Sequence, residues 1–271
     1  MKFYIILIAI LYFFIACEET IELDPLQVEP RYVVESLITD QEKQHFVKLS
    51  KTTGFYDSGK TPRIDNASVK VTTDQHTYDF NYDAEKEMYI SAEAFAGVAN
   101  QEYMLQIDVD GFQITASDKM PSYTQIEDLT WSIDDDEKED PEDPGYFYEM
   151  LVFAKEPQDT RDYYIFKFYR NDSIQNFDGR SVYFADDDMV KESINGLPAP
   201  VFYKEGDKAT FEIYSVSREV YVFYADLNNV ITNDGGMFSP QPANPRNNLS
   251  GDALGIFQVS SMATDSLLIG Q

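Results

Sequence analysis

The sequence predicts a mainly β protein: an N-terminal Ig-like β-sandwich, then a second antiparallel β domain that carries one α-helix. Tyr, Phe, Val, Ile and Thr gather in short runs along the chain, which favours strands over helices. Hydrophobic residues make up 43% of the chain and aromatic residues 14%, too many for a disordered acidic chain. Its length of 271 residues suits one or two domains.

The N-terminus has the pattern of a lipoprotein signal peptide, which we predict to span residues 1–16. Lys2 supplies a positive charge, and residues 3–14 form an unbroken apolar run. In a helix, such a run covers only about 20 Å, short of the roughly 30 Å hydrocarbon core of a bilayer. The run therefore predicts an export signal that is removed, not a spanning helix.

Cys17 is the only cysteine of the chain and follows Phe14-Ile15-Ala16, a segment that resembles a bacterial lipobox. We expect Cys17 to be lipidated and residues 17–30 to form a tether. The alternative is an ordinary cleavage site beside which Cys17 has no role. Glu18 and Glu19 follow directly and resemble an acidic sorting signal, so we expect a chain anchored in the outer membrane and facing the cell exterior.

We place the Ig-like domain at residues 24–121. Val69 and Val71 point one way while Lys70 and Thr72 point the other, the alternation of a half-buried strand. Asp110-Gly111 predicts a tight hairpin between two neighbouring strands. Seven short strands within about 90 residues are typical of an Ig-like sandwich. They are expected at residues 31–39, 45–51, 67–73, 76–82, 88–91, 102–109 and 112–117.

The second domain is expected at residues 122–271 and includes an acidic loop at 134–143, where eight acidic residues repel one another. A helix is predicted at 217–231, because apolar residues recur there every three or four positions and Ser217 is a suitable N-cap. Strands are expected at residues 129–133, 146–154, 162–169, 182–184, 209–214 and 253–260.

The charge excludes some classes of partner. The chain has 48 acidic and 21 basic residues and a formal net charge of -27. Nucleic acids are bound through Lys and Arg that neutralise phosphates, and an anionic membrane surface repels such a chain in the same way. We therefore expect neither as a partner of the folded part.

Few residues are suited to catalysis or metal binding. With two histidines, His45 and His76, and a cysteine assigned to lipidation, a catalytic triad is improbable and a zinc shell of His and Cys cannot close. We expect His45 to be a partly exposed strand residue. No catalytic residue, cofactor or metal ligand is assigned. Calcium stays an alternative at 134–136 and 186–188, with a solvated acidic loop as the default.

Two aromatic stretches, residues 163–169 and 221–224, have two interpretations. Tyr offers a flat face with a polar tip and can line a carbohydrate or peptide platform. Core packing is the simpler interpretation, because aromatic residues are what strands bury. We expect core packing for most of them.

Several segments resemble one known family. These are the lipobox cysteine with its acids, residues 32–40 (YVVESLITD) and 45–50 (HFVKLS), and in the second half residues 217–221, 238–244 and 251–257. Together they are similar to the Bacteroidota lipoproteins grouped as domain-of-unknown-function family 4249 (DUF4249). The resemblance implies a lipid-anchored, two-domain β protein of the outer membrane, often linked to TonB-dependent transporters, and it carries no established activity.

The expected function is accordingly that of a non-enzymatic surface lipoprotein that assists TonB-dependent nutrient uptake. In this hypothesis, the Ig-like domain is a spacer or docking module, and the second domain contacts a β-barrel transporter, a nutrient or another envelope protein. Two alternatives stay open: a glycan or peptide hydrolase with a pair of carboxylates, and an envelope adhesin or scaffold. The hydrolase requires a cleft in which two acids face each other and one pKa is raised.

Overall fold

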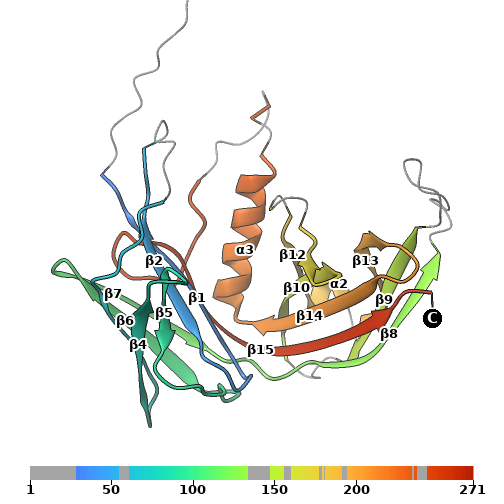
Figure 1. Cartoon of the computed structure of the whole chain (residues 1–271), viewed down its shortest axis with the longest axis horizontal. Coiled ribbons are helices and arrows are strands. Elements are labelled where there is room, and N and C mark those ends of the chain that lie inside the picture. The colour runs from blue at the N-terminus through green and yellow to red at the C-terminus, as the bar shows by residue number, and fades with distance from the viewer. Residues whose placement is uncertain are drawn as a thin grey trace, which may run out of the picture.

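A single curved sheet runs through both halves of the molecule (Figure 1). The computed structural model describes residues 29–54, 61–133, 147–155, 160–176, 179, 181–190, 194–233, 235–236 and 243–270. Within them, twelve strands form this sheet, along the path β11-β10-β14-β15-β1-β2-β5-β4-β3-β6-β7 with β12 beside β10, and three more strands form the sheet β13-β9-β8. The fold is mainly β, as predicted.

The strands of the first half (residues 29–121) are β1 (Tyr32–Thr39), β2 (Phe46–Lys51), β3 (Ser68–Thr72), β4 (Thr77–Asp83), β5 (Met88–Ser91), β6 (Glu102–Val109) and β7 (Phe112–Lys119). Those of the second half (residues 122–270) are β8 (Gln125–Ile133), β9 (Tyr148–Lys155), β10 (Tyr163–Arg170), β11 (Ser173–Ile174), β12 (Tyr183–Asp186), β13 (Ile194–Tyr203), β14 (Lys208–Val216) and β15 (Leu254–Leu268). The helices are α2 (Asp187–Val190) and α3 (Arg218–Ile231).

The first half is a sandwich-like body around its own core. Val69 and Val71 of β3 are buried, as their alternation predicts. β6 and β7 pair as a hairpin around Asp110-Gly111, both with positive φ, the backbone of a two-residue turn. The sheet curls round until β7 meets β15, where the Asp118 Oδ2 accepts a hydrogen bond of 2.8 Å from the Val259 N–H.

The last strand, β15, joins the two halves (Figure 1). Its first part pairs parallel with β1 and its second part antiparallel with β14. Phe257 and Val259 therefore pack in the first core and Ala263 in the second. Gly255 has φ +100°, and a Cβ at this position would collide with the carbonyl oxygen of Val34, so the parallel pairing requires glycine. A domain boundary at residues 121–122 stays a prediction.

The second core lies between the large sheet and β13-β9-β8. It is rich in aromatic side chains, which confirms core packing for much of the 163–169 stretch. Tyr164, Phe166 and Phe168 of β10 face this core, and the Phe211 ring of β14 lies 5.3 Å from the Phe168 ring.

Helix α3 stands on the other face of the sheet and closes a third core. Ser217 is its N-cap, since its Oγ accepts a hydrogen bond of 3.3 Å from the Val220 N–H. Val220 and Phe223 are buried against Ile165 and Tyr214. The helix forms where the sequence predicts one. None of the helices in the described ranges is long and apolar enough to span a membrane.

Three features differ from the sequence prediction. The strand β13 was not predicted. It contains Pro198 and Pro200, which are unusual in a strand interior, and its ladder with β9 is irregular between Pro198 and Phe202. β15 continues to Leu268, well beyond residue 260. The short α2 begins at Asp187, so residues 186–188 do not form one strand.

The prediction that His45 is partly exposed was wrong. Its side chain is buried, with Nε2 2.8 Å from the Phe95 carbonyl oxygen and the ring 4.4 Å from the Phe95 ring. Burial lowers the pKa of His45 to about 4. His45 is therefore a neutral core residue at physiological pH.

Candidate functional site

The residues predicted to anchor and sort the chain, Cys17, Glu18 and Glu19, lie outside the described residues. So does the acidic loop at 134–143. The candidate site is instead a cleft that the sequence analysis did not predict.

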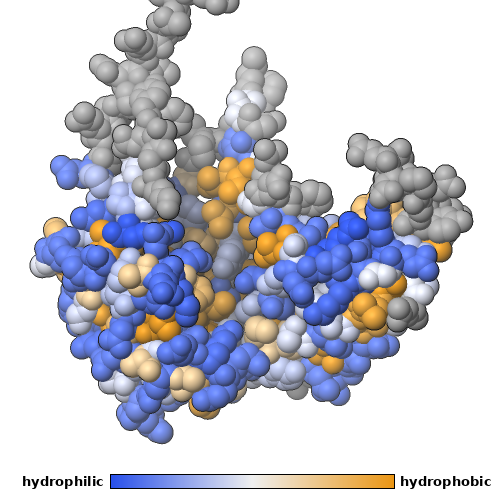
Figure 2. Space-filling view, viewed as in Figure 1, coloured by the Kyte–Doolittle hydropathy of each residue, from blue (hydrophilic) through white to orange (hydrophobic). Residues whose placement is uncertain are grey.

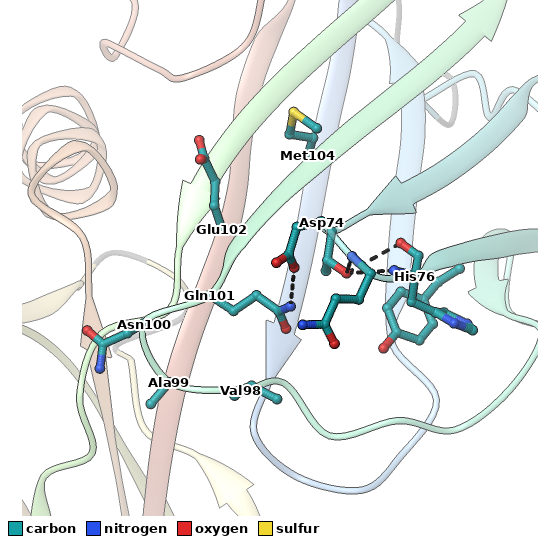
Figure 3. A pocket seen from close by; sticks show the side chains of 11 residues that line it. Asp74, His76, Val98, Ala99, Asn100, Gln101, Glu102 and Met104 are labelled. Atoms are coloured by element: carbon teal, nitrogen blue, oxygen red, sulfur yellow. Dashed lines mark hydrogen bonds between the residues drawn. The ribbon is translucent and has the colours of Figure 1, made fainter.

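Besides two smaller cavities, the described residues enclose a cavity of about 690 Å³ in the first half. We call it the hairpin cleft, because one wall is the turn between β3 and β4 and the other is the segment that leads into β6 (Figure 3). Most of its lining residues are polar, and apolar atoms contribute about half of the lining. The cleft is lined by Thr73, Asp74, Gln75, His76, Tyr78, Val98, Ala99, Asn100, Gln101, Glu102 and Met104.

The first wall is a turn that Thr73 holds in place. Its Oγ1 accepts hydrogen bonds from the backbone N–H groups of Gln75 (3.3 Å) and His76 (3.0 Å). Its own backbone N–H donates to the His76 carbonyl oxygen at 2.8 Å. A Thr side chain that bonds the backbone two and three residues onward is a common turn device.

Gln101 connects this turn to the second wall. Its Nε2 donates to the Asp74 Oδ1 at 2.9 Å (Figure 3). Its Oε1 accepts from the Tyr103 hydroxyl at 3.0 Å. The same hydroxyl accepts from the Val98 N–H at 2.8 Å. Asn100, with φ +67°, makes the bend before β6. The polar groups of the cleft are therefore pre-ordered.

The rings of His76 and Tyr78 line the cleft, and the buried Phe95 ring supports Tyr78 from the core. His76 lies 4.4 Å from Tyr78, which stacks on Phe95 at 3.7 Å. The His76 Nε2 lies 2.9 Å from the Glu93 Oε1, so its imidazole already has a carboxylate partner. Burial, then the charges of Glu93 and Glu42, raise the pKa of Tyr78.

Two apolar side chains stand open at the cleft. Val98 is 59% exposed and Met104 is 52% exposed. Exposed apolar groups beside fixed polar groups are typical of a contact surface, and Met adapts its shape to different partners. The arrangement suits recognition through hydrogen bonds and apolar contact.

The other two cavities lie elsewhere. An apolar groove of about 320 Å³ opens between β12 and β13, with Phe166 and Phe168 among its lining residues. The third, about 540 Å³, lies at the start of β1. There Arg31 forms an ion pair of 2.6 Å with Asp252.

The carboxyl groups whose pKa is raised do not line any of these three cavities. Burial raises the pKa of Asp118 to about 7, although it accepts hydrogen bonds from the N–H groups of Val259 and Lys119. Burial also raises the pKa of Asp162. Asp118 instead lies where β7, β15 and the N-terminus of α3 meet, which indicates a structural position.

Calcium was the open alternative at residues 186–188. Arg161 pairs with Asp188 at 2.7 Å, and Asp187 Oδ2 accepts from the Asp162 N–H at 2.8 Å. Among the described residues, no group of three or more His, Cys, Asp or Glu is placed to hold a metal. Residues 134–136 lie outside that part of the chain.

The comparison with known families agrees with the resemblance seen in the sequence. A model described as a domain of unknown function (DUF4249) matches residues 18–266. The chain belongs to the DUF4249 family. A search among curated proteins found no similar sequence.

Four of the segments that carry the DUF4249 resemblance lie within the described residues. Residues 32–40 form β1 and its end, and residues 45–50 contain most of β2. Residues 217–221 cap and begin α3, and residues 251–257 lead into β15. These four segments lie at the junction between the halves, and none of them lines the hairpin cleft. Cys17 with its acids and residues 238–242 lie outside the described residues. The signal that points to the cleft is the turn chemistry of Thr73 and Asn100.

Proposed function

We propose that this DUF4249 protein is a non-enzymatic, lipid-anchored protein of the outer membrane that faces the cell exterior and assists TonB-dependent nutrient uptake. In this proposal, Cys17 carries the lipid, Glu18 and Glu19 direct sorting, and residues 17–30 form the tether. The hairpin cleft is the contact with the β-barrel transporter. The first half is thus the docking module.

One observation carries the proposal: the cleft lies at the end of the first half opposite to the start of β1. At the start of β1, the Tyr32 hydroxyl donates to Asp110 at 3.0 Å. At its other end, the Thr39 carbonyl oxygen accepts from the Gly97 N–H at 3.0 Å, next to the cleft residue Val98. The eight residues of β1 span about 25 Å. A lipid anchor upstream of β1 leaves the cleft free for a partner.

The chemistry of the cleft favours binding over hydrolysis. A hydrolase built on two carboxylates requires one with a raised pKa inside a cleft. The two carboxyls with raised pKa, Asp118 and Asp162, line none of the three cavities. The cleft offers amides, an imidazole bound to Glu93 and exposed apolar groups, which suit a protein contact.

The test is affinity purification from outer membranes in mild detergent, with the lipid anchor intact. We expect the wild-type chain to co-isolate a β-barrel transporter that mass spectrometry identifies. Met104→Glu should abolish this, because it places a charge in the apolar part of the contact. The matched control is Ile174→Glu, since Ile174 has a similar exposure of 47% but lies on β11. Recovery of the wild-type lipoprotein alone contradicts the proposal.

A further inference from the structure

The cavity of about 540 Å³ at the start of β1 combines exposed aromatic surface with polar side chains. We call it the Phe112 cavity. Its lining comes from the beginning of β1, the end of β2, the beginning of β7 and the turn that precedes β15. Its volume lies within the range of small-molecule sites in proteins. It shares no lining residue with the hairpin cleft.

Two aromatic rings lie side by side in this cavity. Phe112 follows the Asp110-Gly111 turn and is 65% exposed, so most of its ring is open to solvent. The ring of Tyr32 lies 6.2 Å from the Phe112 ring, with an angle of 56° between the two planes. The Tyr32 hydroxyl donates to Asp110 at 3.0 Å, and the Lys51 ammonium lies 4.6 Å from the Tyr32 ring centroid. Tyr32 is therefore held in place, and Phe112 is the ring that a ligand can reach.

Arg31 and Asp252 supply hydrogen-bonding groups in fixed positions. The Arg31 guanidinium forms an ion pair of 2.6 Å with the Asp252 carboxylate, and the Arg31 Nε donates to the Asp252 carbonyl oxygen at 2.7 Å. The Asp252 side chain is 85% exposed, so its carboxylate has room to accept further hydrogen bonds. Planar guanidinium and carboxylate groups bind neighbouring polar groups of a ligand in defined directions.

The charges that line the cavity cancel. Among its described lining residues, Glu29 and Asp252 are acidic, and Arg31 and Lys51 are basic. This balance differs from that of the whole chain, which has 48 acidic and 21 basic residues. A ligand with a net charge of either sign meets repulsion as well as attraction here. The lining therefore favours a neutral ligand that has hydrogen-bonding groups.

A peptide strand does not suit the site. β7 is the last strand on the path of the large sheet, but the turn before β15 covers its edge. The Ser250 N–H donates to the Thr115 carbonyl oxygen at 2.7 Å, and the Thr115 N–H donates to the Ser250 Oγ at 2.8 Å. Both backbone groups of Thr115 on this edge are therefore occupied, and a further strand cannot pair with them.

We propose that the Phe112 cavity binds a neutral saccharide. A sugar ring has a face of C–H groups, which packs on an aromatic ring, and a rim of hydroxyls, which donate to a carboxylate and accept from a guanidinium. In this site, the C–H face packs on Phe112, and Arg31 and Asp252 bind the hydroxyls. The site uses no residue of the hairpin cleft and requires no transporter, so its test is independent of the proposed function.

The test is a glycan microarray probed with the full chain. The detergent must have no sugar headgroup, because a glycoside detergent would compete for the site. The chain is displayed on fluorescent beads, so that many copies compensate for a weak single-site affinity. We expect binding to neutral saccharides and not to the corresponding uronic acids. The strongest neutral saccharide is then titrated by saturation-transfer NMR, and we expect a dissociation constant on the order of millimolar.

Two substitutions of phenylalanine locate the site. Phe112→Ala should weaken the titrated saccharide about tenfold, because the contact with the C–H face is lost. Phe112 is exposed, so an unchanged melting temperature should show that the variant is folded. Phe202→Ala is the matched control, since Phe202 is 40% exposed but lies on β13, and it should bind like wild type.

Asp252→Asn tests the polar part of the site. This variant removes the carboxylate that pairs with Arg31, so it should bind uronic acids that the wild type rejects. No gain of uronic acid binding contradicts the placement of Arg31 and Asp252 in the site. The proposal is overturned if no neutral saccharide binds, if Phe112→Ala binds like wild type, or if the wild type prefers uronic acids.

Discussion

The substitution Asp118→Asn isolates one buried carboxyl group at the junction of the two halves. Asp118 accepts hydrogen bonds from the N–H groups of Val259 and Lys119 and lies beside the N-cap Ser217. Burial nevertheless dominates and raises its pKa from 3.8 to about 7. The folded chain therefore holds this proton over a pH range in which the unfolded chain has released it.

The sign and size of the effect follow from linkage. Because the folded state binds more protons between pH 3.8 and about 7, the contribution of Asp118 to stability is complete below pH 3.8 and falls as the pH rises through this range. At about 1.4 kcal/mol for each pKa unit, the whole interval corresponds to about 4 kcal/mol. Between about pH 5 and about pH 8, the contribution of Asp118 to the free energy of unfolding should fall by about 3 kcal/mol.

The assay is urea unfolding of the wild-type chain and of Asp118→Asn at several pH values in this range. The free energy of unfolding of the wild type relative to the variant should fall by about 3 kcal/mol as the pH rises. Asp108→Asn serves as control, because Asp108 is a β6 carboxyl that hydrogen bonds from Gln113 and Gln106 keep at a lowered pKa. If the free energy of unfolding changed with pH in the same way in the wild type and in Asp118→Asn, the assignment of a buried, protonated carboxyl would be refuted.

Three further substitutions test the fold. Gly255→Ala should destabilise the chain by about 3 kcal/mol or more, because the new Cβ meets the Val34 carbonyl oxygen at a positive φ. Thermal unfolding measures this, and a melting temperature of the variant equal to that of the wild type argues against the parallel pairing of β1 and β15. Because the pKa of His45 is lowered, its contribution to stability is complete above pH 6.5 and is lost as the pH falls toward 4. The wild type should therefore lose about 2 kcal/mol of its free energy of unfolding between pH 6.5 and pH 5, and His45→Gln should not. Urea unfolding at both pH values measures this, and an equal loss in wild type and variant contradicts a buried neutral imidazole. Ser217→Ala should cost about 1 kcal/mol through loss of the α3 cap, and a urea midpoint within error of wild type would show that the cap contributes nothing.

Local signals in the sequence were sufficient for most strands and for the helix. The alternation at Val69 and Val71, the Asp110-Gly111 turn and the cap at Ser217 each act over a few residues, and each is found in the structure. The sequence analysis did not predict β13; its Pro198 and Pro200 are tolerated because β13 lies at the edge of its sheet, where a missing backbone donor costs little.

Contacts between distant segments could not be predicted. The parallel pairing of β15 with β1 joins residues more than 200 positions apart, and only the tertiary fold decides it. His45 is buried because Phe95 packs on it. The hairpin cleft likewise forms from two segments that are separate in the sequence, so local turn signals at Thr73 and Asn100 do not predict that they meet.

The most direct test of the proposed function is site-specific photo-crosslinking in intact cells. Met104→p-benzoylphenylalanine places a crosslinker in the hairpin cleft, and Ile174→p-benzoylphenylalanine places one at similar exposure on β11. We predict a light-dependent crosslink from position 104 to a TonB-dependent β-barrel and none from position 174. No crosslink to such a barrel from position 104, or equal crosslinks from both positions, would contradict the assignment of the cleft as the transporter contact.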